Sequence, residues 1–326
     1  MADVNLGILG VGNWSKKLAS TIQHIDNVNL LTCFSRTSHS REEFAQKFAC
    51  EPAISFDKFI NDRRIDGIII ATPHTTHGDL ICSIAQCKKH IMVEKPLALS
   101  TKDAKRCVEV TRANNVLLQV AHYRRLLPAT RLLYDNISNN TLGKIHLIES
   151  NFSRPFGPDP NRPWRDNEIE APAGAFTALG VHMIDNLIYL GGDVQSVNAL
   201  SSVLDEDSPL DDITSVLLKF KSGAHGVINT SLRLPFIANL CVQGNLASAW
   251  SEEDGHKFFI QKINEVKRTE VSLNKIDGVE QNLRNFCNSI IHQIEPETNG
   301  EEATKVVRVL EAIVESSAKD GLSIQI

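Results

Sequence analysis

The stretch VNLGILGVGNWS, residues 4–15, reads as a strand, a glycine turn and the first residues of a helix. Gly10 permits a tight turn, and Gly12 lets the backbone approach a pyrophosphate at the helix N-terminus. Ser15, a small substitute, takes the third glycine position of the dinucleotide fingerprint. Glycines also serve plain turns, but a strand, this turn and a helix in that order predict a dinucleotide site. The residues expected to contact the dinucleotide here are Gly10, Gly12, Asn13 and Trp14.

Strand-like and helix-like runs alternate from this turn to about residue 121. The first helical run carries Trp14, Leu18 and Ile22 on one stripe. The run at 65–72 is apolar, as expected for a strand buried on both faces. This alternation predicts right-handed crossovers and a doubly wound parallel sheet. The predicted strands are 4–9, 28–34, 65–72, 90–93 and 116–121, and the predicted helices are 14–25, 40–49, 77–87 and 100–114.

The pattern changes after Pro128. A helix is followed by several consecutive strand-like runs, with short turns such as KSGAHG at 221–226 between them. Consecutive strands joined by short turns favour an antiparallel or mixed sheet, so we expect a second domain that begins near 122–128. The predicted strands are 144–152, 195–203, 213–220, 225–232, 238–243, 247–251, 257–261 and 322–326, and the later helices are 179–190, 279–292 and 300–318.

The composition indicates the class of protein. The 326 residues are 42% hydrophobic and 22% charged, as in an ordinary globular chain, and the length suggests two domains. The net charge of −5 gives no reason to expect a nucleic acid as partner. No apolar run is long enough to span a bilayer, and the start lacks the features of a signal peptide. Seven cysteines without a CxxC pair indicate reduced thiols, so we expect a cytoplasmic protein.

The end of the second predicted strand bears on which dinucleotide binds. An NAD site favours an acidic side chain there, but no carboxylate lies between Asp26 and Glu42. Ser35 and Arg36 occupy the position instead, and Arg41 follows. Hydroxyls and guanidinium groups suit a 2′-phosphate, which favours NADP over NAD. Alternatively, Arg36 is a solvated loop residue.

Three further strand ends carry polar residues, and ligands of such sheets bind at the carboxyl ends of the strands. The ends are ATPHTTH at 71–77, EKP at 94–96 and HYRR at 122–125, which we expect to converge on one crevice. A metal at His74 and His77 is not expected, because no third ligand is placed to complete the site. The predicted cofactor contacts at these ends are Thr72, Pro73, His77, Glu94 and Lys95.

The chain resembles the glucose–fructose oxidoreductase, inositol dehydrogenase and related (Gfo/Idh/MocA) family. The resemblance rests on the glycine turn, ATPHTTH, KKHIMVEKPLAL at 88–99 and LGVHMIDNLIYLGG at 179–192, and it spans nearly the whole chain. It implies a Rossmann domain over 1–124 and an α+β domain over 125–326. The second domain's large, open, mostly antiparallel sheet shapes the substrate pocket and often a dimer contact. Members mostly use NAD(P) and act on sugars, cyclitols and related polyols.

Oxidation of an alcohol needs a base near oxygen and a nicotinamide near carbon. Lys95 supplies a cation that can hydrogen-bond the reacting hydroxyl. The alternative role of Lys95 is a surface ion pair with Glu94. The resemblance implies that the peptide bond from Lys95 to Pro96 is cis. His182 can take the proton from the hydroxyl and return it, and Asp185 is expected to orient the His182 ring. The alternative is that His182 is a structural histidine of the core.

The chain departs from the family at Ala178. Well-known members place an aspartate four residues before the histidine, and Ala178 occupies that position. Trp164 and Arg165 match the family's tryptophan near the active site, so we expect Trp164 to cover the substrate and Arg165 to bind the cofactor. Tyr123 and Arg124 are also expected near the substrate.

These residues together predict an NADP(H)-dependent oxidoreductase with a small-molecule substrate, and the resemblance implies a homodimer or homotetramer through the C-terminal sheet. Two alternatives remain open. One is a nicotinamide-dependent glycosidase-type reaction by transient oxidation, and the other is a non-catalytic, cofactor-binding regulator, which the loss of the aspartate would explain.

Overall fold

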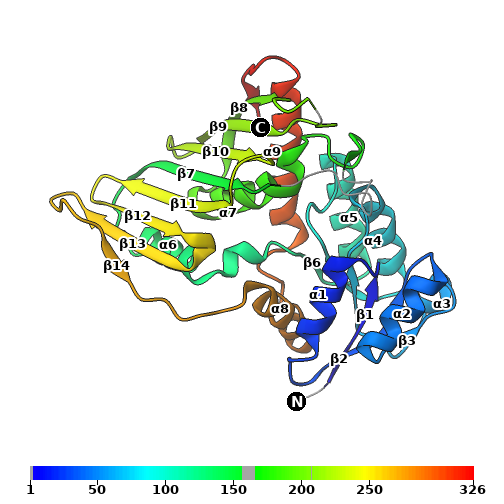
Figure 1. Ribbon diagram of the computed structural model, residues 1–326. Coiled ribbons are helices and arrows are strands. Elements are labelled where there is room, and N and C mark those ends of the chain that lie inside the picture. Colours follow the sequence, from blue (N-terminus) through cyan, green and yellow to red (C-terminus); the bar gives the residue numbers. More distant parts are fainter. Residues whose placement is uncertain (1–2, 156–165, 207) are drawn as a thin grey trace. The chain divides into compact units, whose positions relative to one another are not determined.

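The computed structural model describes residues 3–155, 166–206 and 208–326. The chain divides into two compact units (Figure 1). Unit 1 comprises Met1–Tyr123 and Asp277–Thr304, and unit 2 comprises Arg124–Ile276 and Lys305–Ile326. This division differs from the expected one, in which the second domain ran unbroken from 125 to 326. The chain leaves unit 2 at residue 277 and returns after 304, so the second domain is interrupted.

Unit 1 is built on a six-stranded parallel sheet in the order β3-β2-β1-β4-β5-β6. The order reverses between β1 and β4, which is where ligands of doubly wound sheets bind. The predicted fold of this unit is confirmed, although the short strand β3 was not predicted. The strands are β1 (Val4–Leu9), β2 (Val28–Phe34), β3 (Glu51–Pro52), β4 (Gly67–Ile70), β5 (His90–Val93) and β6 (Leu118–Val120).

Helix α8 (Gly278–His292) explains why the segment after residue 276 belongs to unit 1. Its apolar residues Leu283 and Phe286 are fully buried in the same core cluster as Leu6 and Ile8 of β1. The other helices of unit 1 are α1 (Asn13–Ile22), α2 (Ser38–Phe48), α3 (Phe56–Ile60), α4 (His77–Gln86) and α5 (Thr101–Ala113).

Unit 2 contains a nine-stranded sheet in the order β14-β13-β12-β11-β7-β10-β9-β8-β15. Strands β7 and β10 pair in parallel, and the remaining neighbours pair antiparallel, which confirms the mostly antiparallel sheet. The strands are β7 (Ile145–Ser153), β8 (Val194–Ser202), β9 (Ile213–Phe220), β10 (His225–Ser231), β11 (Ile237–Gly244), β12 (Ala247–Glu252), β13 (Lys257–Lys262), β14 (Thr269–Val271) and β15 (Ile324–Gln325).

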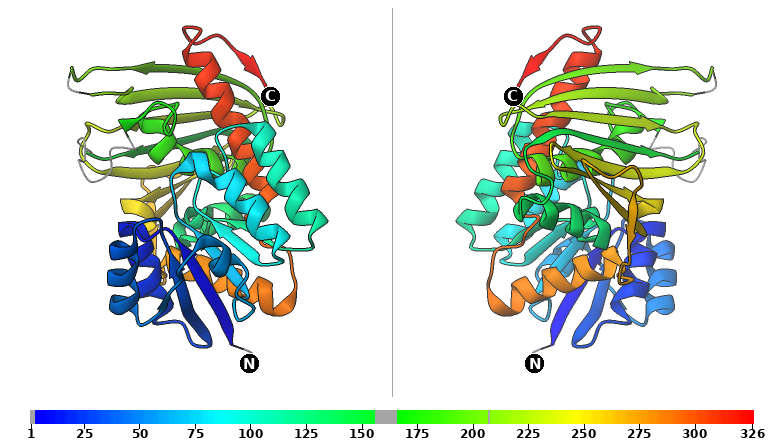
Figure 2. Two further views of the ribbon diagram at one scale, coloured as in Figure 1. Left: turned by 90° about the vertical axis from the view of Figure 1, so that its right-hand side faces the viewer. Right: turned by 90° about the vertical axis from the view of Figure 1, so that its left-hand side faces the viewer.

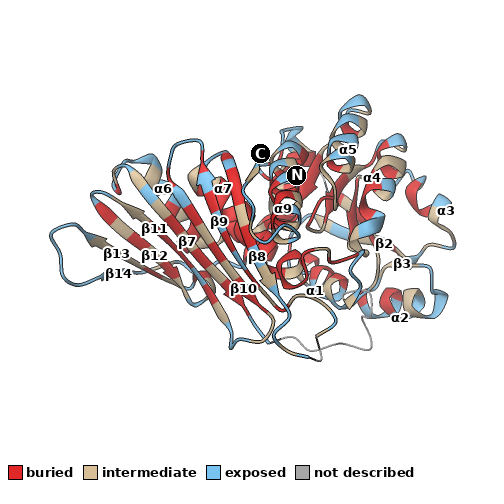
Figure 3. Cartoon of the chain, turned by 90° about the horizontal axis from the view of Figure 1, so that it is seen from above, coloured by how far each residue is buried: buried red, intermediate tan, exposed pale blue. Residues whose placement is uncertain are grey.

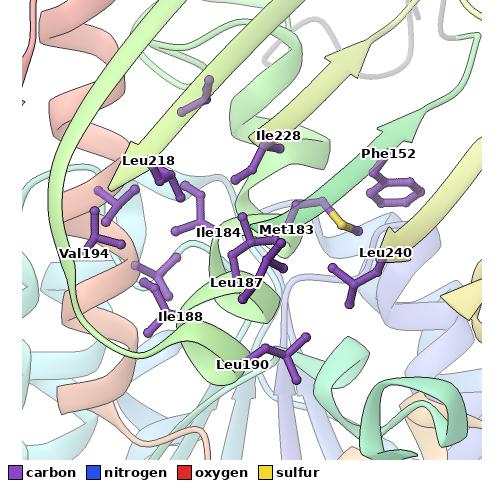
Figure 4. Close-up of a cluster of buried hydrophobic side chains, with 14 of the residues drawn as sticks. Phe152, Met183, Ile184, Leu187, Ile188, Leu190, Val194, Leu218, Ile228 and Leu240 are labelled. Atoms are coloured by element: carbon purple, nitrogen blue, oxygen red, sulfur yellow. The ribbon is translucent and has the colours of Figure 1, made fainter. Parts of the chain in front are cut away.

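Helices cover one face of this sheet (Figure 2). Leu187 of helix α7 packs toward Leu218 and Ile228 of the strands (Figure 4). The covering helices are α6 (Pro128–Ser138), α7 (Val181–Gly191) and the part of α9 (Gly300–Ser317) that belongs to unit 2.

Among the described residues of unit 2, no helix covers the opposite face of the sheet. Buried and exposed residues alternate along β9, and Figure 3 shows the same alternation on its neighbours. Leu217 is 48% exposed on this face, whereas Leu218 beside it is fully buried. No helix within the described ranges is long and apolar enough to cross a membrane.

Candidate active site

The glycine turn joins β1 to α1 at the switch in strand order. Gly10 has a φ of +91°, and a Cβ atom there would lie 2.4 Å from the carbonyl oxygen of Ala71, so only glycine fits. Gly12 caps α1 with extended backbone, and a Cβ atom there would meet nothing within 4 Å. The turn therefore closes tightly against the end of β4 and leaves open space at Gly12, where the N–H groups of the first helical turn begin. Asn13 is exposed and Trp14 half-buried in that turn.

Arg41 shapes the loop after β2. Its Nη1 atom donates to the carbonyl oxygen of Ser35 over 2.8 Å, and its guanidinium lies 5.4 Å from the centre of the Phe34 ring. The Ser35 hydroxyl donates to the carbonyl oxygen of Thr37. Arg36, in contrast, is exposed. The loop thus presents Arg36 to solvent, while Arg41 holds its backbone.

His77 joins the ends of β4 and β5. Its Nδ1 atom lies 2.9 Å from the carbonyl oxygen of Pro96, and its Nε2 atom lies 3.1 Å from that of Thr72. The side chain is fully buried. It therefore does not line the surface at the strand ends, where we expected it to contact the cofactor. Both partners are acceptors, so a neutral ring can donate to only one of them and a protonated ring to both. The hydroxyl of Thr72 contacts that of Thr76 over 2.7 Å.

Trp14 and Glu94 link the glycine turn to the end of β5. The indole N–H of Trp14 donates a short hydrogen bond to a carboxylate oxygen of Glu94. Burial raises the pKa of Glu94, although the neighbouring Lys95 and the indole N–H both act to lower it. The bond from Lys95 to Pro96 is cis, as the resemblance implied. The Tyr123 ring lies 6.2 Å from that of Trp14, so an aromatic pair flanks the same turn.

In unit 2, His182 is the second residue of α7. It is 5% exposed, and its ring lies edge-on to Phe152 at 5.8 Å between centres. Both carboxylate oxygens of Asp185 accept hydrogen bonds from Arg125, at 2.9 and 2.8 Å, and both side chains are almost fully buried. Asp185 thus neutralises a buried guanidinium, a role that the sequence did not predict for it.

A single π-helical turn, Phe176–Gly180, precedes α7 and was not predicted. A Cβ atom at Gly180 would lie 2.5 Å from the Phe176 ring, so the turn requires glycine there. Ala178 is half-buried against the apolar core of unit 2. The hydroxyl of Thr177 accepts a bond from the backbone N–H of Ala173 over 3.0 Å, which ties this side chain to the backbone before the turn.

Arg124 pairs with Asp254, which lines a surface cavity of about 490 Å³ in unit 2 that sequence reasoning missed. Its Nη2 atom lies 2.5 Å from a carboxylate oxygen of Asp254, and its guanidinium lies 4.3 Å from the centre of the Phe152 ring. No local motif marks this pair, because its members lie far apart in the sequence. The cavity is lined by Phe236, Ile237, Ala238, Asn239, Glu252, Glu253, Asp254 and His256.

Two of the predicted site residues, Trp164 and Arg165, lie outside the described residues. Within the described part of the chain, no group of three or more His, Cys, Asp or Glu side chains is close enough to hold a metal ion.

Comparisons with known proteins match two family models to this chain. The family model described as "Oxidoreductase family, NAD-binding Rossmann fold" (GFO_IDH_MocA) matches residues 4–122. The model described as "GFO/IDH/MocA C-terminal domain" matches residues 130–249.

Individual relatives resemble the chain over most of its length. Myo-inositol 2-dehydrogenase of Thermotoga maritima is 30% identical over 71% of this chain and 69% of that protein. D-xylose 1-dehydrogenase [NADP(+)] of Haloarcula marismortui is 24% identical over 98% of this chain and 92% of that protein. A crystal structure from Desulfitobacterium hafniense, whose assignment as an NADPH-dependent oxidoreductase is provisional, superposes with a TM-score of 0.93 at 25% identity, covering 100% of this chain and 98% of that one.

Proposed function

The chain belongs to the Gfo/Idh/MocA family of oxidoreductases, and on that premise we propose that it transfers a hydride between NADP(H) and a sugar-, cyclitol- or dihydrodiol-like alcohol or ketone. The observation that carries the proposal is the bond from Trp14, in the helix that follows the glycine turn, to Glu94. This bond ties Lys95 to the turn where a dinucleotide binds. Relatives named as dehydrogenases favour net hydride transfer over the glycosidase-type and regulatory alternatives.

The preference for NADP is supported by the loop after β2. Arg36 is exposed at the position where an NAD site would favour a carboxylate, and Arg41 fixes the backbone on which it stands. A guanidinium can hold a 2′-phosphate through two parallel hydrogen bonds. The glycine turn and the N-terminal N–H groups of α1 would hold the pyrophosphate.

The bound nicotinamide supplies or accepts the hydride, and side chains of this chain handle the proton. We assign Lys95 the role of hydrogen-bonding the reacting oxygen, which stabilises the alkoxide character that develops there. We assign His182 the proton transfer, because an imidazole titrates near neutral pH. We also assign Asp185 a structural role, because both of its carboxylate oxygens accept hydrogen bonds from the buried Arg125.

The cavity in unit 2 supports a polyol as substrate. Asn239 and Asp254 offer amide and carboxylate groups, and Phe236, 53% exposed, offers an apolar wall. A few polar groups on an apolar wall suit a molecule that carries hydroxyls around a hydrocarbon ring. We propose that this cavity reads the hydroxyls that do not react.

The proposal extends to assembly and location. The open sheet face, with exposed Leu217 and Leu200, is a candidate for a dimer contact, which light scattering coupled to size exclusion tests. All seven cysteines are free thiols, which supports a cytoplasmic location.

The test of the function is a spectrophotometric assay at 340 nm with NADP⁺ and NAD⁺ against inositols, aldoses, anhydrosugars and cyclic dihydrodiols. We expect turnover of at least one polyol class, with higher kcat/KM for NADP⁺. Tight NADPH binding without turnover of any class would favour the regulatory alternative.

A further inference from the structure

The cavity in unit 2 has a buried cation behind its wall. Arg124 is 4% exposed, and its Nη2 atom lies 2.5 Å from the Oδ1 atom of Asp254, which lines the cavity. The guanidinium packs on the Phe152 ring, and its Nε and Nη1 atoms have no hydrogen-bond partner among the described residues. The Asp254 side chain is 37% exposed, so it balances the buried charge from the cavity side. We call Arg124 and Asp254 the inner pair.

The turn Glu253–Gly255, which joins β12 to β13, has an unusual backbone. Its three residues have φ angles of +50°, +59° and +84° in chain order. Side chains other than glycine rarely adopt this left-handed conformation, so the first two positions are strained. Strain of this kind persists where surrounding contacts hold the backbone, and the contact within the inner pair is one of them. Arg124 therefore fixes where the Asp254 carboxylate stands on the cavity wall.

The other two carboxylates of the cavity also pair with cations. Glu252 lies 2.8 Å from Nη1 of Arg268, and Glu253 lies 2.6 Å from Nζ of Lys257. Three carboxylates therefore pair with three cations, and these groups give the cavity no net charge. The two outer pairs are largely exposed, so water and salt screen them, whereas the cation of the inner pair is buried. The inner pair thus has the strongest influence on the charge that a ligand meets.

The wall of the cavity offers both a donor and an acceptor. The Oδ1 atom of Asn239 accepts from the backbone N–H of Asn151 over 3.0 Å, which leaves the amide NH₂ group of Asn239 as a donor. The inner pair uses one oxygen of Asp254, which leaves the second as an acceptor. A hydroxyl both donates and accepts, whereas an ammonium group only donates and a carboxylate only accepts. A polyol can therefore use both groups of the wall.

We propose that the inner pair makes this cavity select uncharged polyols over amino and acid analogues of the same ring, with Arg124 as the positioning residue of Asp254. Asp254 accepts a hydrogen bond from one hydroxyl, and Asn239 donates to another. A protonated amine loses its water and meets a carboxylate whose charge Arg124 already balances, so it gains little in return. A ligand carboxylate meets the like charge of Asp254. The inference rests on the proposed function for the polyol itself.

Variants of the inner pair change the charge of the cavity in opposite directions. Ligand-observed NMR titration of the full chain near pH 7, where an amine is largely protonated, measures the Kd of glucose, glucosamine and glucuronate. Inositol and its amino analogue form a second series. Wild type should bind the uncharged member of each series most tightly. Arg124→Gln should shift the ratio of Kd values toward the amine by about tenfold, and Asp254→Asn should shift it toward the acid by a similar factor. The double variant should restore the wild-type order.

Lys221→Gln is the matched control, because it breaks an exposed ion pair with Asp193 elsewhere in unit 2 and should keep the wild-type order. A purely structural role of the inner pair would weaken all ligands together, and that result would overturn the inference. So would a wild type that binds the amine or the acid best, or that binds no ligand of either series.

Asp254→Asn changes a partly exposed side chain, so it carries the test if Arg124→Gln does not fold. An unchanged ratio of the Kd values of glucuronate and glucose in this variant would overturn the inference. Selective binding of the uncharged ligands without turnover would leave the inference standing and count against the proposed hydride transfer. Turnover of a polyol without any preference for uncharged ligands would have the reverse meaning.

Discussion

His77 supports the site from within the core. Sequence reasoning assigned it to the cofactor because it stands at a strand end, but its ring is fully buried between two backbone carbonyl groups. One of these belongs to Pro96, the residue after Lys95, so the histidine fixes the peptide on which the proposed catalytic lysine stands.

Substitution of His77 should therefore reduce turnover more than cofactor affinity. His77→Leu removes both contacts and should destabilise the fold by about 1–3 kcal/mol, since it leaves buried carbonyl groups unsatisfied. His77→Asn keeps an amide donor near the position of Nδ1 and should recover part of kcat. Urea unfolding and steady-state kinetics check this. Equal kcat values for the two variants would contradict the role of the Pro96 contact.

Glu94 should make stability depend on pH. Burial raises its folded-state pKa above 4.5, so the fold favours the protonated form. Its contribution to stability is complete below about pH 4.5 and is lost as the pH rises through the folded-state value. Glu94→Gln resembles the protonated form, so its stability advantage over the cofactor-free wild type should be smallest near pH 4.5 and grow toward pH 8. Melting temperatures over this range test it, with exposed Glu109→Gln as control. An advantage that shrinks with rising pH would contradict the assignment.

Arg36 should decide the choice of cofactor. Hydrogen bonds to charged groups contribute about 1.5–3 kcal/mol, so Arg36→Ala should weaken NADPH binding by about 10- to 100-fold and leave NADH binding nearly unchanged. Fluorescence titration measures both, with the exposed Arg63→Ala as control. Parallel losses for NADPH and NADH would contradict a role at the 2′-phosphate.

At the scale of elements, hydrophobic periodicity predicted most strands and helices, because each one has a face or stripe that must be buried. Strand β3 has only two residues, Glu51–Pro52, so it has no periodicity to detect. The π-turn at Phe176–Gly180 depends on the contact between a glycine and a ring, which spacing does not reveal. The prediction of a helix at 279–292 was correct. That this helix packs in unit 1 depends on contacts with residues far away in the sequence, which a local pattern does not reveal.

Helix α7 should depend on the pair of Arg125 and Asp185. Asp185→Asn leaves a buried guanidinium without its counter-charge and should destabilise the chain by about 3–5 kcal/mol. Arg125→Met with Asp185→Leu should recover most of this loss. Urea unfolding of the single and double variants tests it. An Asp185→Asn chain of normal stability with a large loss of kcat would contradict the structural role. It would instead support Asp185 as the residue that orients His182.

For the whole molecule, the sequence predicted the fold class and the family, because a glycine turn after a strand and a Lys–Pro after a buried strand are local patterns, and here they occur together with alternating strands and helices. Partnerships between distant residues were not predictable. Trp14 and Glu94 are 80 positions apart, and nothing in either local sequence indicates the other. The same holds for Arg124 and Asp254, which only the folded unit 2 brings together.

The central claim is that Lys95 promotes hydride transfer on a polyol or its ketone. It is tested most directly by single-turnover oxidation of enzyme-bound NADPH, at saturating ketone, in the wild type and Lys95→Met. Removal of a donor that stabilises developing oxyanion charge predicts a loss of about 10²–10³ in the rate, with NADPH affinity within about threefold of wild type. A Lys95→Met rate close to that of the wild type would contradict the claim.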